Sequence, residues 1–279
     1  MQPLKGEVAV VTGASRGARK GIALVLGEAG ATVYVTGRST RASTTRPDLP
    51  NTTIEDTAEA IRKRGGNGVP VQVNHTDEKQ VMALFEQVKQ EQGNLDTLVN
   101  NAWGGCENIT DSWFEDVFWK QPLTRFDKML NTALRATAMT TSYALPLMIP
   151  QQHGAIFNIT LEMDTTFYDQ ALFYRTTKVA LNYMTYGMAH DLHQRSSLDI
   201  AVIGIAPGWM RTEDVMKHFA EGLAPSEELV KTESVEYVGR AILALTTDEN
   251  IMQKTGQILR TRDLAREYNF LDIDGKRHE

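Results

Sequence analysis

The chain opens with an apolar strand that leads through a glycine-containing turn into a helix. Residues 8–11 form an uninterrupted apolar run, which is typical of a strand covered by helices on both faces of a parallel sheet. Gly13 and Gly17 follow in the turn. Because glycine has no Cβ, the backbone can approach a ligand closely there, and the first N–H groups of the helix point toward it. The pattern favours a phosphate-binding turn over a tight turn that binds nothing.

Composition excludes several classes of protein. The 279 residues are 42% hydrophobic, which suffices for a large core, and no linker divides them, so we expect one domain over residues 1–279. A formal net charge of -6 argues against nucleic acid or a membrane as a partner. Cys106 is the single cysteine, and no metal-ligand spacing occurs, so we expect no disulfide bond and no metal. The sequence lacks the apolar run of a signal peptide or a membrane span, which predicts a cytoplasmic protein.

Apolar runs that suit strands alternate with amphipathic stretches that suit helices. After the first strand and helix, the expected strands are residues 32–36, 69–73, 95–99, 155–159, 200–205 and 257–259. The expected helices are residues 53–63, 77–92, 123–148, 171–194 and 235–245. This alternation predicts an α/β protein with a doubly wound parallel sheet, the Rossmann fold. In such sheets ligands bind beyond the carboxyl ends of the strands, so candidate site residues are sought there.

Basic residues gather where the second expected strand ends. Arg38 follows that strand, Arg16 lies in the first turn, and Arg41 and Arg46 lie in the next loop as possible substitutes. A site for NAD places a carboxylate near this point, whereas arginine suits the additional phosphate of NADP. This strand end carries no carboxylate, so the sequence favours NADP. The alternative is a set of solvated loop arginines.

Tyr174 and Lys178 are four residues apart in the helix expected over 171–194, so they share one face. An ammonium group beside a phenol favours the phenolate and lowers a pKa that is ordinarily about 10. A proton donor to a carbonyl near neutral pH requires this property. A tyrosine and a lysine at this spacing also occur in helices by chance, so the pair indicates a catalytic role only together with other motifs.

Four motifs, in order along the chain, resemble the short-chain dehydrogenase/reductase family. They are Thr-Gly-Ala-Ser-Arg-Gly at 12–17, Leu-Val-Asn-Asn-Ala at 98–102, Tyr-Arg-Thr-Thr-Lys at 174–178 and Ala-Pro-Gly-Trp-Met-Arg-Thr at 206–212. The resemblance covers nearly the whole chain. Residues 36–38, the long segment before Phe126 and the ending at 262–268 are most similar to the subgroup of dehydrogenase/reductase member 1 and its bacterial relatives.

The resemblance implies an oxidoreductase that interconverts a carbonyl and a secondary alcohol by hydride transfer with NADP(H). Its partner would be a small carbonyl or alcohol substrate, and the chain would form a homodimer or homotetramer. Residues 207–232 would form a substrate-side loop and residues 260–279 a C-terminal extension.

The family motifs also imply roles for single positions. Tyr174 would be the general acid/base, and Lys178 would hold the nicotinamide ribose. Asn74 stands where the family usually has aspartate, and His75 would contribute its backbone. The implied cofactor-binding residues, from the diphosphate and adenosine to the carboxamide, are Gly13, Ser15, Arg16, Gly17, Arg38, Asn74, His75, Asn101, Ala102, Lys178, Pro207, Gly208 and Thr212.

Arg19 departs from the family pattern, because it occupies the position of the third glycine in the first turn. Its side chain must either point away from the strand or reach toward phosphate, and Gly21 is expected to relieve part of the crowding. Helix packing close to the strand is the usual reason for glycine at this position.

The position of the usual catalytic serine, thirteen residues before Tyr174, is Leu161. Thr160 is therefore a candidate catalytic hydroxyl, although it faces the site only if the strand end is bulged by one residue. Substitutes from the loop are Glu162, Asp164, Thr165 and Tyr168. Loss of one such donor typically slows catalysis about a hundredfold to a thousandfold.

Ala133 aligns with the asparagine that helps to hold a water in the family's proton relay. Together with Leu161, it leaves two of the usual four catalytic residues in place. Two functions follow: an oxidoreductase with an altered proton path, or a sensor or scaffold that binds NADPH without turnover.

Overall fold

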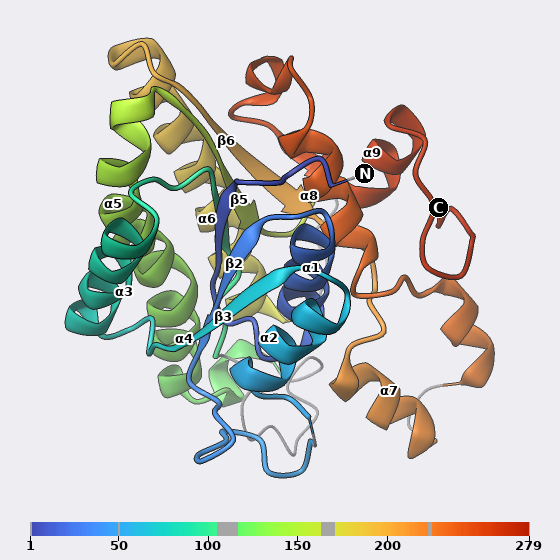
Figure 1. Ribbon diagram of the computed structural model, residues 1–279. Coiled ribbons are helices and arrows are strands. Elements are labelled where there is room, and N and C mark those ends of the chain that lie inside the picture. The colour runs from blue at the N-terminus through green and yellow to red at the C-terminus, as the bar shows by residue number, and fades with distance from the viewer. Residues whose placement is uncertain (1, 50, 105–116, 163–170, 223–224, 279) are drawn as a thin grey trace.

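A seven-stranded parallel sheet runs through the centre of the protein with helices on both faces (Figure 1). The computed structural model describes residues 2–49, 51–104, 117–162, 171–222 and 225–278. The strands are β1 (Val8–Val11), β2 (Thr32–Gly37), β3 (Asn67–Gln72), β4 (Thr97–Asn100), β5 (His153–Ile159), β6 (Asp199–Ala206) and β7 (Ile258–Arg260). Their spatial order, β3-β2-β1-β4-β5-β6-β7, reverses between β1 and β4, and this switch point is where ligands of doubly wound sheets bind.

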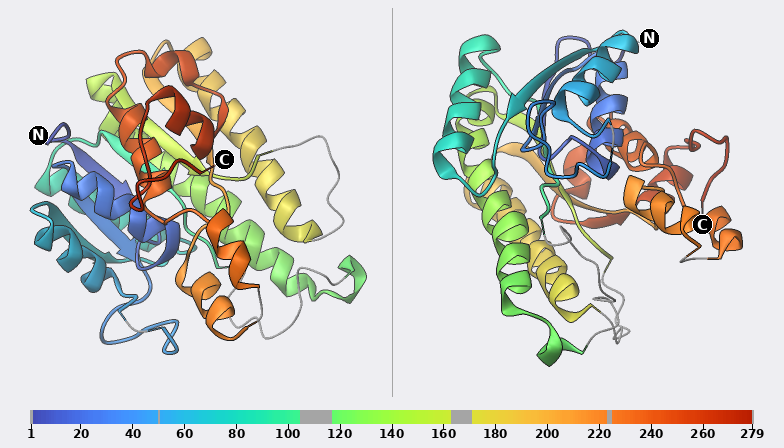
Figure 2. Two further views of the ribbon diagram at one scale, coloured as in Figure 1. Left: turned by 90° about the vertical axis from the view of Figure 1, so that its right-hand side faces the viewer. Right: turned by 90° about the horizontal axis from the view of Figure 1, so that it is seen from below.

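Helices cover the sheet in two layers, which the view from below separates (Figure 2). One layer contains α1 (Gly17–Glu28), α2 (Ile54–Lys63) and α8 (Tyr237–Thr246), and the other contains α3 (Glu78–Glu91), α5 (Ala136–Met148) and α6 (Leu172–His190). Alternate residues of β1 face opposite layers: Ala9 and Val11 belong to the first core cluster, and Val8 and Val10 to the second. Burial on both faces explains why β1 is apolar without interruption.

The sheet and its single domain agree with the prediction from sequence, although several element bounds differ. The helix expected over 123–148 consists of α4 (Leu123–Met129), a π-helical segment η2 (Leu130–Arg135) and α5. The helix expected over 171–194 ends at His190 and continues as a π-helical segment η4 (Asp191–Arg195). Two helices that the sequence analysis did not predict are α7 (Glu213–Ala220) and α9 (Thr261–Glu267). Short 3-10 turns are η1 (Phe118–Lys120), η3 (Ile149–Gln151), η5 (Ser226–Lys231) and η6 (Ile251–Lys254).

The helix α7 lies at the edge of the molecule, below the carboxyl ends of the strands in Figure 1. Its eight residues form an amphipathic pattern, yet none of them is buried among the described residues. It follows β6 within the segment that the sequence assigns to a substrate-side loop. Among the described residues, no helix has the length and apolar character that crossing a membrane demands.

Candidate active site

A cleft opens at the carboxyl ends of the strands, beside the switch point between β1 and β4; we call it the strand-end cleft. Its walls come from the first turn, from the ends of β2, β3 and β4, and from η2. The residues that line it include Gly13, Arg16, Arg38, His75, Ala102 and Trp103. The structure thus brings together candidate residues from four segments: the first turn and the segments that follow β2, β3 and β4.

The turn between β1 and α1 has the conformation that only glycine adopts freely. Gly13 has a φ of 71° and Gly17 a φ of 60°. A Cβ on Gly13 would lie 3.3 Å from the Cα of Ala102, so the turn and the end of β4 are in close contact. The N–H of Gly17 donates to the carboxylate of Glu213 over 2.9 Å. This helix N-terminus therefore holds a carboxylate of the protein itself, and phosphate binding at the turn stays a prediction.

Arg19 lies across this turn. A Cβ on Gly13 would be 3.0 Å from its Cδ, and its Nη1 lies 3.4 Å from the carbonyl oxygen of Trp103, so the side chain extends into the strand-end cleft. Close helix packing occurs instead at Gly21, where a Cβ would lie 1.9 Å from the carbonyl oxygen of Val235. The glycine that lets α1 approach its neighbour is therefore two residues beyond the usual position.

Arg16 and Arg38, which the sequence proposes as partners of the NADP phosphate, both line the strand-end cleft. The guanidinium of Arg16 donates to the hydroxyls of Ser39 and Thr45 over 3.3 and 3.2 Å, and these hydroxyls lie 2.8 Å apart. The result is a polar wall of arginine and hydroxyl groups beside the end of β2.

Arg41 and Arg46, the possible substitutes for Arg16 and Arg38 at the phosphate of NADP, pair with carboxylates. Arg41 forms ion pairs with Asp56 and Glu59 over 2.7 and 2.6 Å. Arg46 pairs with Asp48 and Asp214 over 2.8 and 2.6 Å. Both belong to surface networks, so the structure does not support them as members of the cleft.

His75 contributes a buried side chain that the sequence analysis missed. Its Nε2 lies 2.8 Å from the hydroxyl of Thr36, which itself donates to the carbonyl oxygen of Val11, so we assign the ring proton to Nε2. The Nδ1 atom is then a buried acceptor with no partner among the described residues. Burial and the positive charge of Arg38 lower the pKa of His75 to about 3, so the ring is neutral.

Asn74 is bound within its own turn, where Oδ1 accepts from the N–H and hydroxyl of Thr76.

Thr12 holds the segment after β4 in place. Its hydroxyl accepts from the N–H groups of Asn101 and Ala102 over 2.8 and 3.0 Å and donates to the carbonyl oxygen of Val99. The Nδ2 of Asn101 is buried without a partner among the described residues. Unpaired buried donors and acceptors of this kind are costly and suit a site that binds a polar ligand.

Tyr174 and Lys178 lie on one face of α6 beside Trp103. The rings of Trp103 and Tyr174 meet edge to face, with centroids 5.3 Å apart and an interplanar angle of 83°. Lys178 is buried, donates from Nζ to the carbonyl oxygen of Ile159 over 2.9 Å, and lies 5.2 Å from the Trp103 centroid. The predicted pair is therefore assembled next to the segment that follows β4.

Thr160 requires a correction. Its N–H donates to the carbonyl oxygen of Ile205 over 2.8 Å, so the sheet ladder continues without the bulge that a catalytic role needs. Its hydroxyl lies 2.6 Å from Oδ1 of Asn182 and 3.2 Å from the carbonyl oxygen of Lys178. Because this hydroxyl has one proton and both partners are acceptors on α6, we assign Thr160 to the core and not to catalysis.

The other substitutes for the missing serine are not supported either. Glu162 forms an ion pair with Arg260 over 3.0 Å. Asp164, Thr165 and Tyr168 lie outside the described residues. Ala133 is buried in η2, where it offers no side-chain donor.

The segment after β6 is held by a buried carboxylate that the sequence analysis did not identify. Glu233 accepts from the N–H of Gly208 over 3.1 Å, and a Cβ on Gly208 would lie 2.9 Å from Oε2 of Glu233. Burial raises the pKa of Glu233 to about 7.

Thr212 caps α7 by accepting from the N–H of Val215, and its methyl group would be 3.6 Å from a Cβ on Gly17. Pro207, which precedes Gly208, is half-buried.

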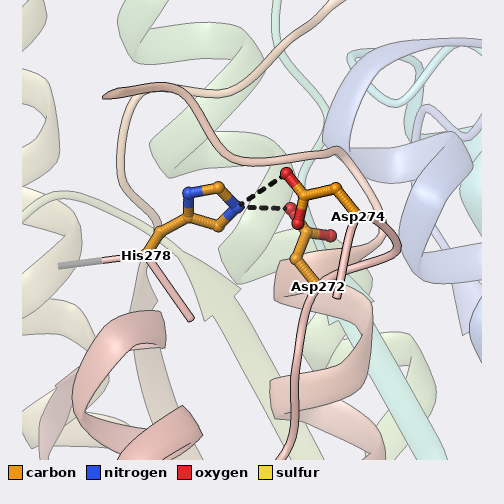
Figure 3. Close-up of side chains that lie close together, drawn as sticks. All are labelled: Asp272, Asp274 and His278. Atoms are coloured by element: carbon orange, nitrogen blue, oxygen red, sulfur yellow. Dashed lines mark hydrogen bonds and ion pairs between the residues drawn. The ribbon is translucent and has the colours of Figure 1, made fainter. Parts of the chain in front are cut away.

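Asp272, Asp274 and His278 form a cluster near the C-terminus (Figure 3). The Nε2 of His278 lies 2.9 Å from Asp272 and 3.6 Å from Asp274. Asp272 is buried and also accepts from the N–H of Ser234 and from Arg211, over 2.7 and 3.3 Å. Because a guanidinium already lies against both carboxylates, we assign the cluster a structural role, which is to bind the C-terminal segment to the segment after β6.

Comparison with known proteins identifies the family of this chain. A family model described as short chain dehydrogenase matches residues 7–222. The mouse protein named dehydrogenase/reductase SDR family member 1 is 36% identical over 286 residues, which cover 98% of this chain and 85% of the mouse protein.

Solved structures share the fold. A putative dehydrogenase from Xanthomonas campestris superimposes with a TM-score of 0.80 at 24% identity, covering 98% of this chain and 94% of the other. A 7α-hydroxysteroid dehydrogenase, solved with NADH and 7-oxo glycochenodeoxycholic acid, superimposes with a TM-score of 0.73 at 25% identity and covers 92% and 93% of the two chains. The family model and the near full-length relative establish that this chain is a member of the short-chain dehydrogenase family, whose members are oxidoreductases that use NAD(P).

Proposed function

We propose that the protein is an NADP(H)-dependent oxidoreductase that interconverts a carbonyl and a secondary alcohol, with Tyr174 as the general acid/base. The observation that carries this proposal is the juxtaposition of Tyr174 and the buried ammonium of Lys178 on α6. A phenol can release its proton to a carbonyl oxygen near neutral pH only if the phenolate is stabilised, and a nearby cation does this.

The proton transfer involves two side chains. Bound NADPH supplies the hydride to the carbonyl carbon. Tyr174 donates its phenolic proton to the carbonyl oxygen, so the carbonyl becomes a secondary alcohol. Lys178 stabilises the phenolate until a proton returns from solvent. In the reverse direction, the Tyr174 phenolate accepts the proton of the alcohol.

The preference for NADP(H) rests on Arg16 and Arg38. Both line the strand-end cleft at the end of β2, where the 2′-phosphate of NADP would lie, and the hydroxyls of Ser39 and Thr45 add further polar partners. The related 7α-hydroxysteroid dehydrogenase was solved with NADH. The basic wall of this cleft supports the phosphorylated cofactor instead.

A direct test compares the wild type with Tyr174→Phe. Consumption of NADPH and NADH is followed against aldehydes, ketones and quinones after binding of each cofactor has been measured. We expect turnover with NADPH that falls at least about a hundredfold in Tyr174→Phe, while the affinity for NADPH changes little. Equal turnover by both proteins contradicts the proposed role of Tyr174.

A second function, an NADPH-binding sensor or scaffold, is favoured by Leu161 and Ala133, whose side chains cannot donate hydrogen bonds. It predicts tight binding of NADPH, no turnover of any carbonyl or alcohol, and a protein partner whose binding depends on the cofactor. Pull-down experiments with and without NADPH, combined with the substrate panel, distinguish the two functions.

Assembly into a homodimer or homotetramer is supported by exposed apolar residues on α6. The side chains of Leu172, Val179, Tyr183 and Tyr186 are exposed on this helix. Such a stripe suits packing against a second copy. Light scattering of the wild type and Tyr183→Glu gives the mass of each species, and a lower mass for the variant supports assembly through α6.

A further inference from the structure

Trp103 contacts both members of the proposed catalytic pair, and the proposed function does not use it. Its backbone is fixed from two sides: the preceding Ala102 is bound to Thr12, and the following Gly104 donates to the hydroxyl of Thr132 over 3.1 Å. Its carbonyl oxygen also accepts from Arg19. Trp103 therefore presents its indole to α6 from a segment that is anchored at the end of β4.

The indole contacts both members of the pair. It meets the Tyr174 ring edge to face at 5.3 Å, and the Lys178 ammonium lies 5.2 Å from its centroid and 5.7 Å from that of Tyr174. Trp103 and Tyr174 also pack on a small core cluster formed by Met129, Ala171 and Phe173. The ammonium is thus positioned near two aromatic rings as well as the carbonyl oxygen of Ile159.

Two physical effects follow from this arrangement. Burial of a lysine disfavours its charged form, whereas the π systems of indole and phenol attract a cation. An edge-to-face contact also restricts the orientation of the tyrosine ring. Both effects favour an ammonium beside the Tyr174 ring, and the side chains at positions 133 and 161 offer it no hydrogen bond.

We propose that Trp103 is a positioning residue, which holds the Tyr174 phenol and the Lys178 ammonium in their reactive arrangement. This inference rests on the proposed function of Tyr174. Trp103 acts through Lys178 and also through its edge-to-face contact with Tyr174, so part of its contribution depends on the lysine.

The test is a double-mutant cycle on the single-turnover rate of NADPH oxidation with excess enzyme. Trp103→Leu removes the π system, and Trp103→Phe keeps a smaller one. We expect Trp103→Leu to lower the rate constant about tenfold to thirtyfold at a saturating concentration of the panel compound that the wild type reduces fastest. The concentration of that compound at half-maximal rate should change little, and Trp103→Phe should recover most of the loss. In the Lys178→Met background, Trp103→Leu should lower the rate constant by a smaller factor than in the wild-type background, because residues that act through one another are not additive.

The matched control is Trp119→Leu, the same substitution at a side chain that is 70% exposed on η1, and it should retain wild-type rates. Thermal denaturation verifies that each variant is folded, and Trp103→Phe keeps the test valid if Trp103→Leu does not fold. Additive losses in the cycle, or equal losses in Trp103→Phe and Trp103→Leu, overturn the role of Trp103. Wild-type turnover by Tyr174→Phe in the same assay instead overturns the proposed function itself.

Discussion

The carboxylate of Glu213, in the first turn of α7, accepts a hydrogen bond from the N–H of Gly17 at the start of α1. These residues are 196 positions apart in the chain. The adjacent Asp214 pairs with Arg46, and Lys217 pairs with Asp48, so α7 is bound both to the first turn and to the loop after β2. In this arrangement an internal carboxylate interacts with the helix N-terminus at which a phosphate of the cofactor is expected to bind.

Glu213→Gln should therefore bind NADPH more tightly than the wild type. The substitution removes a negative charge that competes with the cofactor at the positive end of α1, and charge effects at helix termini predict a gain of about threefold to tenfold. Isothermal titration calorimetry measures the affinity directly. Glu221→Gln, at the other end of α7, is the matched control and should bind like the wild type. Weaker binding by Glu213→Gln would mean that this carboxylate assists the cofactor.

Arg38→Ala should reduce the preference for NADPH over NADH. Loss of one charged hydrogen-bonding partner of the 2′-phosphate predicts about a tenfold to hundredfold weaker affinity for NADPH, with the affinity for NADH nearly unchanged. Fluorescence titration of both cofactors measures the two affinities. Arg41→Ala is the control, because Arg41 follows the same strand but pairs with Asp56 and Glu59. A parallel loss for NADPH and NADH in Arg38→Ala would place the arginine elsewhere along the cofactor.

Glu233 should make the protein less stable as the pH rises. Burial raises the pKa of Glu233 from 4.5 to about 7 in the folded protein, so the folded state binds more protons than the unfolded state between these values. The protonated form contributes its full stability below about pH 4.5, and the contribution is lost as the pH rises through about 7. Glu233→Gln is neutral at every pH and can still accept from Gly208.

Urea denaturation of both proteins at pH 5 and pH 8 measures this effect, because the two differ only in one titrating group. The difference in unfolding free energy should move in favour of Glu233→Gln at the higher pH, by up to about 3 kcal/mol. A difference that is independent of pH would show that Glu233 keeps an ordinary pKa.

Gly21→Ala should destabilise the fold strongly. The added Cβ would lie 1.9 Å from the carbonyl oxygen of Val235, which is backbone and cannot move aside without shifting α8 away from α1. Overpacking of this kind costs about 3 kcal/mol or more. Gly187→Ala in α6 is the control, because its Cβ would have no atom within 4 Å and alanine is the better helix former. Thermal unfolding should show a lower midpoint for Gly21→Ala and an unchanged or higher one for Gly187→Ala.

The sequence by itself determined the sheet and the outline of the cleft. Apolar runs such as residues 8–11 specify strands buried on both faces, and their alternation with helical periods leaves few topologies open. The i,i+4 spacing of Tyr174 and Lys178 placed them on one face, and the glycine turn located the switch point. The catalytic and cofactor-binding roles of these residues remain predictions.

Only the tertiary structure decided which side chains meet in the cleft. The hydroxyl of Thr160 turned out to be bound to Asn182, because the β5–β6 ladder continues past the end of the strand. Three other contacts likewise join distant segments. Arg19 enters the cleft, Trp103 contacts Tyr174, and Glu213 accepts from Gly17. Local periodicity specifies which face of an element is buried, but contacts between distant elements depend on how those elements pack, and no local pattern encodes that packing.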